Sequence, residues 1–76
     1  MKKISVVIAK RHSTSLTLED EFYEELLRIA DQKKCGINEL ITKIDSERTI
    51  KNLSSAVRIY ILTELKKELN VSKTNA

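Results

Sequence analysis

Residues 11–30, RHSTSLTLEDEFYEELLRIA, contain the change of spacing that decides the fold of this 76-residue chain. Up to residue 18 polar and apolar residues alternate, most clearly in Ser-Leu-Thr-Leu at 15–18, which is the spacing of a half-buried strand. From residue 19 three acids come first, and Phe22 then starts an apolar stripe with helical spacing. The stretch therefore predicts a strand that passes directly into a helix, with Thr17 as the N-cap.

Toward the amino terminus the predicted strand extends over about residues 3–18, where Ile, Val, Ser and Thr dominate. No Asn-Gly, Asp-Gly or Gly-Gly pair lies near residues 10–12, so we expect no tight two-residue hairpin there. The rest of the chain offers no good second strand. Because a lone strand cannot pair its edges or cover its apolar face, we expect it to pair with the same strand of a second copy.

Apolar spacing after the strand predicts three helices, and the polar end of the chain predicts a frayed tail. Gly36 separates the first two helices, and Asn52 or Ser54 caps the third. We expect one domain over residues 1–70 that is mostly α, with one N-terminal β-strand. The expected bounds are about 18–34, 37–46 and 53–69 for the helices and 71–76 for the tail.

The third predicted helix is apolar around more of its circumference than one face of a small monomer can bury, because Ile59 and Leu62 lie off its main stripe. Burial against a second subunit explains this width, and a helix wrapped on all sides by the core is the alternative. The length of the chain also favours association, because one small core without a disulfide or a metal is marginal by itself.

Composition and charge exclude several classes of protein. One cysteine (Cys35) and one histidine (His12) provide neither an internal disulfide nor a zinc site of three or four ligands. The apolar run at residues 4–9 is too short for a signal peptide or a membrane span. We therefore expect a cytoplasmic protein with no metal, no cofactor and no membrane contact.

The charges are unevenly distributed. Residues 1–18 carry four bases and no acid, whereas residues 19–34 carry six acids and three bases. A polyanion would therefore meet the amino-terminal segment first. The alternative on charge alone is a solvated terminus followed by ordinary helix charges.

The polar face of the predicted strand is the main candidate site; it consists of Arg11, Ser13, Ser15 and Thr17. Hydroxyl groups and a guanidinium on alternate positions suit a β-ribbon in the major groove of DNA, which is about 12 Å wide, and a solvent-facing sheet surface is the alternative. Catalysis fits poorly, because the segment has no glycine and no carboxylate before Glu19 to build an oxyanion hole or to orient a base. We predict no enzymatic activity and no small-molecule substrate.

Four motifs in order resemble the ribbon-helix-helix family of MetJ- and Arc-type repressors, and in particular a subgroup of short bacterial proteins. Together they lie within roughly residues 8–65. They are the histidine-and-hydroxyl strand at 11–18, Leu-Glu-Asp-Glu-Phe-Tyr at 18–23, Ile-Asp-Ser-Glu-Arg at 44–48 and Asn-Leu-Ser-Ser-Ala-Val-Arg at 52–58.

The resemblance implies an intertwined homodimer whose strands pair across a two-fold axis, here with an additional C-terminal helix. It also implies base contacts by the ribbon and phosphate binding at the start of the second helix, with duplex DNA as the partner. The function would be that of a transcriptional regulator. The alternative is a protein-interaction module, an antitoxin or assembly adaptor, built on the same dimer. On this sequence the DNA-binding residues are Lys10, Arg11, Ser13, Ser15 and Thr17, and the phosphate-binding residues are Gly36, Ile37 and Asn38.

Overall fold

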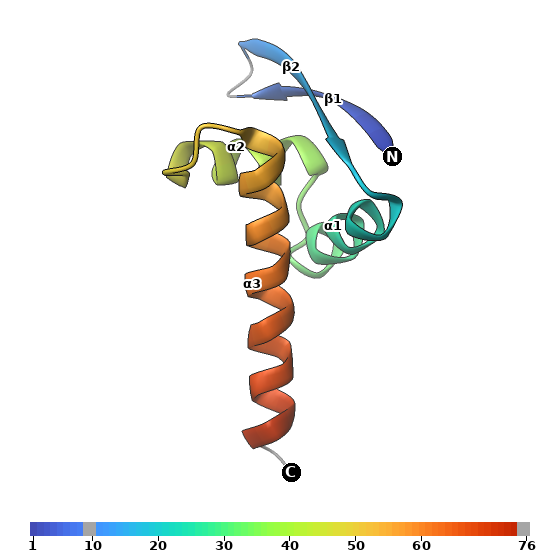
Figure 1. The fold of residues 1–76 in the computed structure, drawn as a ribbon, viewed down its shortest axis with the longest axis vertical. Coiled ribbons are helices and arrows are strands. Elements are labelled where there is room, and N and C mark those ends of the chain that lie inside the picture. The colour runs from blue at the N-terminus through green and yellow to red at the C-terminus, as the bar shows by residue number, and fades with distance from the viewer. Residues whose placement is uncertain (9–10, 75–76) are drawn as a thin grey trace.

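A computed structural model describes residues 1–8 and 11–74 of the chain, with side chains as far as Asn70. An antiparallel hairpin is followed by three helices, and the longest helix runs away from the hairpin (Figure 1). This order confirms the expected fold class, a mostly helical chain with an N-terminal ribbon and an additional C-terminal helix. The elements are β1 (Lys2–Ile8), β2 (His12–Leu18), α1 (Asp20–Gln32), α2 (Ile37–Glu47) and α3 (Leu53–Thr74).

The hairpin corrects the prediction of one continuous strand. β1 and β2 pair within a single chain, with Lys2 opposite Leu18 and Ile8 opposite His12. The N–H of Arg11 donates to the carbonyl of Ile8 at 3.1 Å, which closes a connection of three residues. Hairpins with connections of this length do not need the Asn-Gly or Gly-Gly pair of a two-residue turn, so the missing pair did not exclude a hairpin.

The alternation of polar and apolar residues places one face of the hairpin on the helices. Val6, Ile8, Leu16 and Leu18 are buried, whereas the strand residues that alternate with them, Ser5, Val7, Ser15 and Thr17, are exposed. The same core contains residues from all three helices, so the hairpin and the helices share one apolar interior. The helical residues buried in it are Leu26, Ile29, Ala30, Leu40, Ile41, Ile44, Ala56, Val57 and Ile61.

The start of α1 differs from the prediction. Glu19 is the N-cap and its side chain makes no capping hydrogen bond. Thr17, the predicted cap, still belongs to β2, where its N–H donates to Oγ of Ser54 at 3.2 Å. The strand extends to Leu18 because that side chain is fully buried in the core, which delays the helix by two residues.

α1 ends in a reversal that directs the chain into α2. Lys34 has a φ of 55°, in the left-handed region. The N–H of Cys35 donates to the Ala30 carbonyl and the N–H of Lys34 donates to the Asp31 carbonyl, both at 3.0 Å. These two bonds are those of a Schellman motif, in which glycine usually occupies the position that Lys34 has here.

α3 begins as predicted and ends later. The Oδ1 atom of Asn52 accepts the N–H of Ser55 at 3.0 Å, which confirms the predicted cap. The helix continues to Thr74, past the expected end at residue 69, so residues 71–74 are helical where a frayed tail was expected. No proline or glycine follows Asn70 to stop the helix. Residues 75–76 lie outside the described part of the chain.

Ion pairs connect α3 to α1. Arg28 donates two hydrogen bonds of 2.9 Å to the carboxylate of Glu68, which lowers the pKa of Glu68. Arg58 of α3 bonds Glu19 at 2.9 Å and lowers the pKa of that carboxyl. These polar contacts therefore attach the first turns of α3 to the N-cap of α1, and the second half of α3 to α1 itself.

Candidate nucleic-acid interface

The solvent-facing side of the hairpin brings together the exposed residues of both strands. The register places Lys3 opposite Thr17, Ser5 opposite Ser15, and Val7 opposite Ser13. We call this surface the outer face. All of its side chains are exposed, while the other face of the same strands is in contact with the core. Its members are Lys3, Ser5, Val7, Ser13, Ser15 and Thr17.

The strand residues predicted to contact bases are close together, and the predicted arginine is at the tip. Ser13, Ser15 and Thr17 follow one another on the exposed side of β2. Arg11 is exposed but lies in the turn before β2, beyond the last paired residues. Lys10, the remaining predicted contact, lies outside the described residues.

The sequence-based prediction of the site did not include the half of the outer face that β1 contributes, because β1 was treated as a continuation of β2. Lys3, Ser5 and Val7 alternate with apolar residues in β1 as the serines do in β2, and this alternation is the signal that could have found them. Val7 is apolar and 41% exposed, so it places a methyl-bearing surface among hydroxyl groups.

The start of α2 lies beside β1. The Oδ1 atom of Asn38 accepts the N–H of Val7 at 3.4 Å, and a shallow hollow there is lined by both strands and Asn38. Gly36 is the N-cap and supplies no side-chain bond, so the first backbone N–H groups of α2 have no capping side chain. Such groups favour an anion. Glu39 places a carboxylate in the same turn and opposes this effect.

β2 has an outer edge that β1 does not cover. The N–H groups of Val7 and Thr17 donate to side chains outside the ladder. Because N–H groups point to opposite edges of a strand at successive residues, those of Ser13 and Ser15 also point away from β1. A hollow beside this edge separates β2 from the connection between α2 and α3. Its lining includes His12, Ser13, Ser15, Asp45, Arg48, Lys51 and Ser54.

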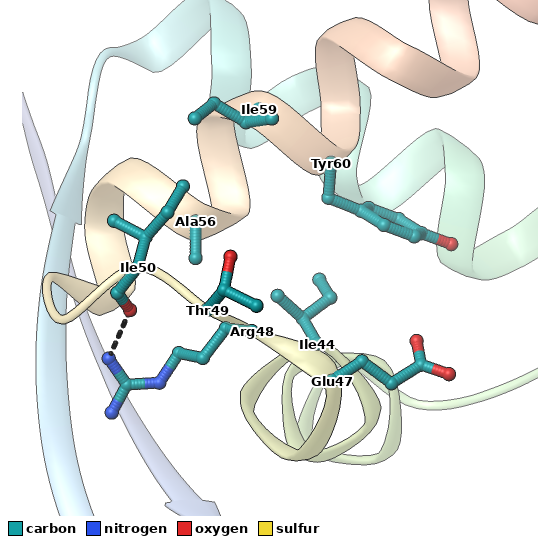
Figure 2. A pocket seen from close by; sticks show the side chains of 8 residues that line it. All are labelled: Ile44, Glu47, Arg48, Thr49, Ile50, Ala56, Ile59 and Tyr60. Atoms are coloured by element: carbon teal, nitrogen blue, oxygen red, sulfur yellow. Dashed lines mark hydrogen bonds between the residues drawn. The ribbon is translucent and has the colours of Figure 1, made fainter.

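A third hollow lies between the end of α2, the α2–α3 connection and α3 (Figure 2). Its lining is largely apolar, with Ile44, Ile50 and Ile59 from the three segments. Arg48 bonds Asp45 at 2.7 Å and donates to the carbonyl groups of Ile50 and Lys51. The guanidinium therefore holds the α2–α3 connection in place, and Glu47, Thr49 and Tyr60 are the other polar residues of the lining.

The described residues show neither a cluster of metal ligands nor a membrane-spanning helix. In residues 1–8 and 11–74, no group of three or more His, Cys, Asp or Glu side chains is placed to hold a metal ion. Within the same residues, no helix has the length and apolar content needed to cross a membrane.

Comparison with protein families agrees with the resemblance seen in the sequence. The family model of the ribbon-helix-helix domain matches residues 1–65, which include both strands, α1, α2 and the first half of α3. The chain therefore belongs to the ribbon-helix-helix family. Proteins with this domain are generally DNA-binding transcription regulators or antitoxins, and they typically bind DNA as dimers. Among curated proteins and solved structures, none matches the chain.

Proposed function

We propose that this protein is a transcriptional regulator of the bacterial cytoplasm that places the outer face of its hairpin in the major groove of DNA. The observation that carries the proposal is the composition of this face, where hydroxyl groups and one ammonium group are exposed on a two-stranded ribbon. The groove, about 12 Å wide, admits a ribbon of two strands, which in the dimer proposed below are the two β2 strands. Ser13, Ser15 and Thr17 would contact base edges, because a hydroxyl group both donates and accepts.

Charged groups at the border of the outer face have separate roles in this proposal. Arg11, at the tip of the hairpin, would bond a guanine through two hydrogen bonds, and Lys10, its neighbour in sequence, would contribute a further positive charge to DNA binding. Lys3 would meet a phosphate, since a flexible ammonium group contacts the DNA backbone without selecting a base. The N–H groups at Gly36, Ile37 and Asn38 would hold a second phosphate beside β1.

We further propose a homodimer in which the uncovered edge of β2 pairs with the same edge of a second copy. The backbone groups of Ser13 and Ser15 point toward that edge, and a hollow lies beside it. In this arrangement the two β2 strands are central and face the bases. The β1 strands flank them, which brings Lys3 toward the phosphates at the walls of the groove.

The first experiment is selection of bound sequences from a random duplex library, followed by measurement of affinity at several salt concentrations. A regulator should enrich one sequence with two-fold symmetry, and its affinity should fall steeply with salt because phosphate contacts release counterions. Recovery of no preferred sequence, together with weak binding at every salt concentration, would contradict the proposal. The protein-interaction module would then be the better account of the same fold.

A further inference from the structure

α3 has a second apolar face that nothing in the described chain covers. At 100° per residue, Val57 and Ile61 face the core, and Ile59, Leu62 and Leu69 lie on the opposite side. These three side chains are 50%, 48% and 63% exposed. The ion pair of Glu68 with Arg28 of α1 keeps the core-facing side turned inward, so the exposed face cannot rotate into the interior.

The spacing on this face is that of a coiled-coil seam. Ile59, Leu62, Lys66 and Leu69 are separated by three, four and three residues, as are alternating a and d positions of a heptad repeat. An isoleucine at a with leucines at d favours two parallel helices, and one lysine at an a position fixes the register at some cost in stability. We call these four residues the α3 stripe.

The border of the α3 stripe does not oppose the approach of a second, identical helix. Arg58, at one flank, is held by Glu19 at 2.9 Å, and the hydroxyl group of Thr63, at the other, donates to the carbonyl of Ile59 at 2.8 Å. Lys66 is the one charge within the stripe. Its long side chain can extend to water from an a position while its methylene groups remain packed.

We propose that α3 pairs in parallel with α3 of a second copy through the α3 stripe. The start of α3 already lies beside the edge of β2 that β1 does not cover, because Oγ of Ser54 accepts the N–H of Thr17 there. From that point α3 runs away from the hairpin (Figure 1). Two β2 strands paired antiparallel about a two-fold axis therefore bring two α3 helices to the same side of the sheet, where they run in the same direction.

The two contacts support each other. The stripe covers less than two heptads, whereas a free-standing coiled coil needs at least three to four. The inference thus rests on the proposed strand-paired dimer for its second contact. A shared interface of strands and helices also accounts for the width of the apolar surface on α3, which a single chain leaves exposed.

The first test is sedimentation equilibrium of the parent chain, Leu62→Lys and Leu27→Lys. Leu27 of α1 is a matched control, because it is 41% exposed and does not belong to the stripe. We expect the parent chain to be a dimer. Leu62→Lys should raise the dissociation constant of the dimer at least about tenfold, because each copy loses a leucine from the interface and gains a charge there. Leu27→Lys should leave the dissociation constant unchanged. Equal dimerisation of all three chains would overturn the α3 pairing, as would equal weakening by both variants.

A second test gives the direction of the helices. In a Cys35→Ser background, Leu69→Cys should form a disulfide-linked dimer on oxidation, because parallel pairing places both copies of residue 69 in one layer. Lys67→Cys is the control, since residue 67 lies off the stripe. Absence of the link at 69, or equal linking at both positions, would overturn the parallel arrangement.

The outcomes also separate this inference from DNA binding. A parent dimer that selects a DNA sequence but is unaffected by Leu62→Lys leaves the proposed function intact and removes the α3 pairing. If Leu62→Lys dissociates the dimer but the parent dimer selects no DNA sequence, the α3 pairing is supported and the proposed function is contradicted. A parent chain that stays monomeric at about 100 µM, far above the concentrations at which specific dimers form, overturns the α3 pairing and the strand-paired dimer together.

Discussion

At the connection between α1 and α2, a lysine has a backbone conformation that glycine usually adopts, and a glycine has one that any residue adopts. Lys34 has a left-handed backbone conformation that costs about 1–2 kcal/mol for a residue with a Cβ atom. The conformation is retained because the two hydrogen bonds that end α1 depend on it. Gly36, by contrast, has a φ of −78°, which any residue adopts, and its φ does not explain why glycine is there.

Replacement of Lys34 by glycine should stabilise the protein. Lys34→Gly removes the backbone strain but adds freedom to the unfolded chain, so we expect the free energy of unfolding to rise by about 0.5–1 kcal/mol. Urea denaturation measures it. Lys34→Ala is the control, because alanine also carries a Cβ atom and should give no comparable gain. Equal stabilisation by both variants would show that the lysine side chain, and not the backbone, is the cause.

The two lysines at the start of β1 should differ in their effect on DNA affinity. Lys2 has its ammonium group 5.5 Å from the centre of the Tyr23 ring, whereas Lys3 lies on the outer face. Lys3→Ala should weaken binding to all sequences alike and lower the salt dependence by about one ion per contact. Lys2→Ala should leave the salt dependence nearly unchanged. Affinity titrations at several salt concentrations decide this, and equal slopes for the parent and Lys3→Ala would contradict the phosphate contact.

At the scale of elements, periodic spacing was a better guide than turn chemistry. α2 was expected at about 37–46 and occupies Ile37–Glu47, because its buried residues Leu40, Ile41 and Ile44 follow helical spacing closely. The alternation in β2 likewise placed Ser13 and Ser15 on the exposed side. The hairpin was missed because only two-residue turns were considered, and three-residue connections carry no comparable pair of residues.

The packing of α3 on α1 should depend on acidity. The pKa of Glu68 is lowered from its ordinary 4.5 by its hydrogen bonds with Arg28, so the folded protein binds this proton less readily than the unfolded chain. The resulting stability is present above pH 4.5 and is lost as the pH falls through the lowered value.

Thermal unfolding of the parent chain and of Glu68→Gln, measured between pH 7 and pH 3, tests this expectation. Glu68→Gln should be less stable than the parent at pH 7, and the difference should shrink as the pH falls, because protonation removes the same charge in the parent. A difference that stays constant over this range would show that the ion pair does not contribute to the acid sensitivity.

The whole molecule combines the family fold with two features for which we propose a second copy as the partner, the edge of β2 that β1 does not cover and the α3 stripe. The outer face follows from alternation along two strands, and the core on the other face holds it in place. Spacing alone marked Ile59 and Leu62 as lying off the main apolar stripe of the third helix, but it located neither the uncovered edge of β2 nor the side of the chain on which the α3 stripe lies. Their positions depend on the intrachain hairpin and on the ion pairs of Glu68 and Glu19, which join residues far apart in the sequence.

Base selection by Ser15 is the most direct test of the central claim, that the outer face of the hairpin reads DNA. Affinity for the selected site and for its single-base variants is measured with the parent, Ser15→Ala and the control Ser46→Ala, a serine exposed on α2. Ser15→Ala should lose about 0.5–1.5 kcal/mol, the net value of one neutral hydrogen bond, and relax the preference at one base per half-site. Ser46→Ala should match the parent. Unchanged affinity and unchanged base preference in a correctly folded Ser15→Ala would contradict the account.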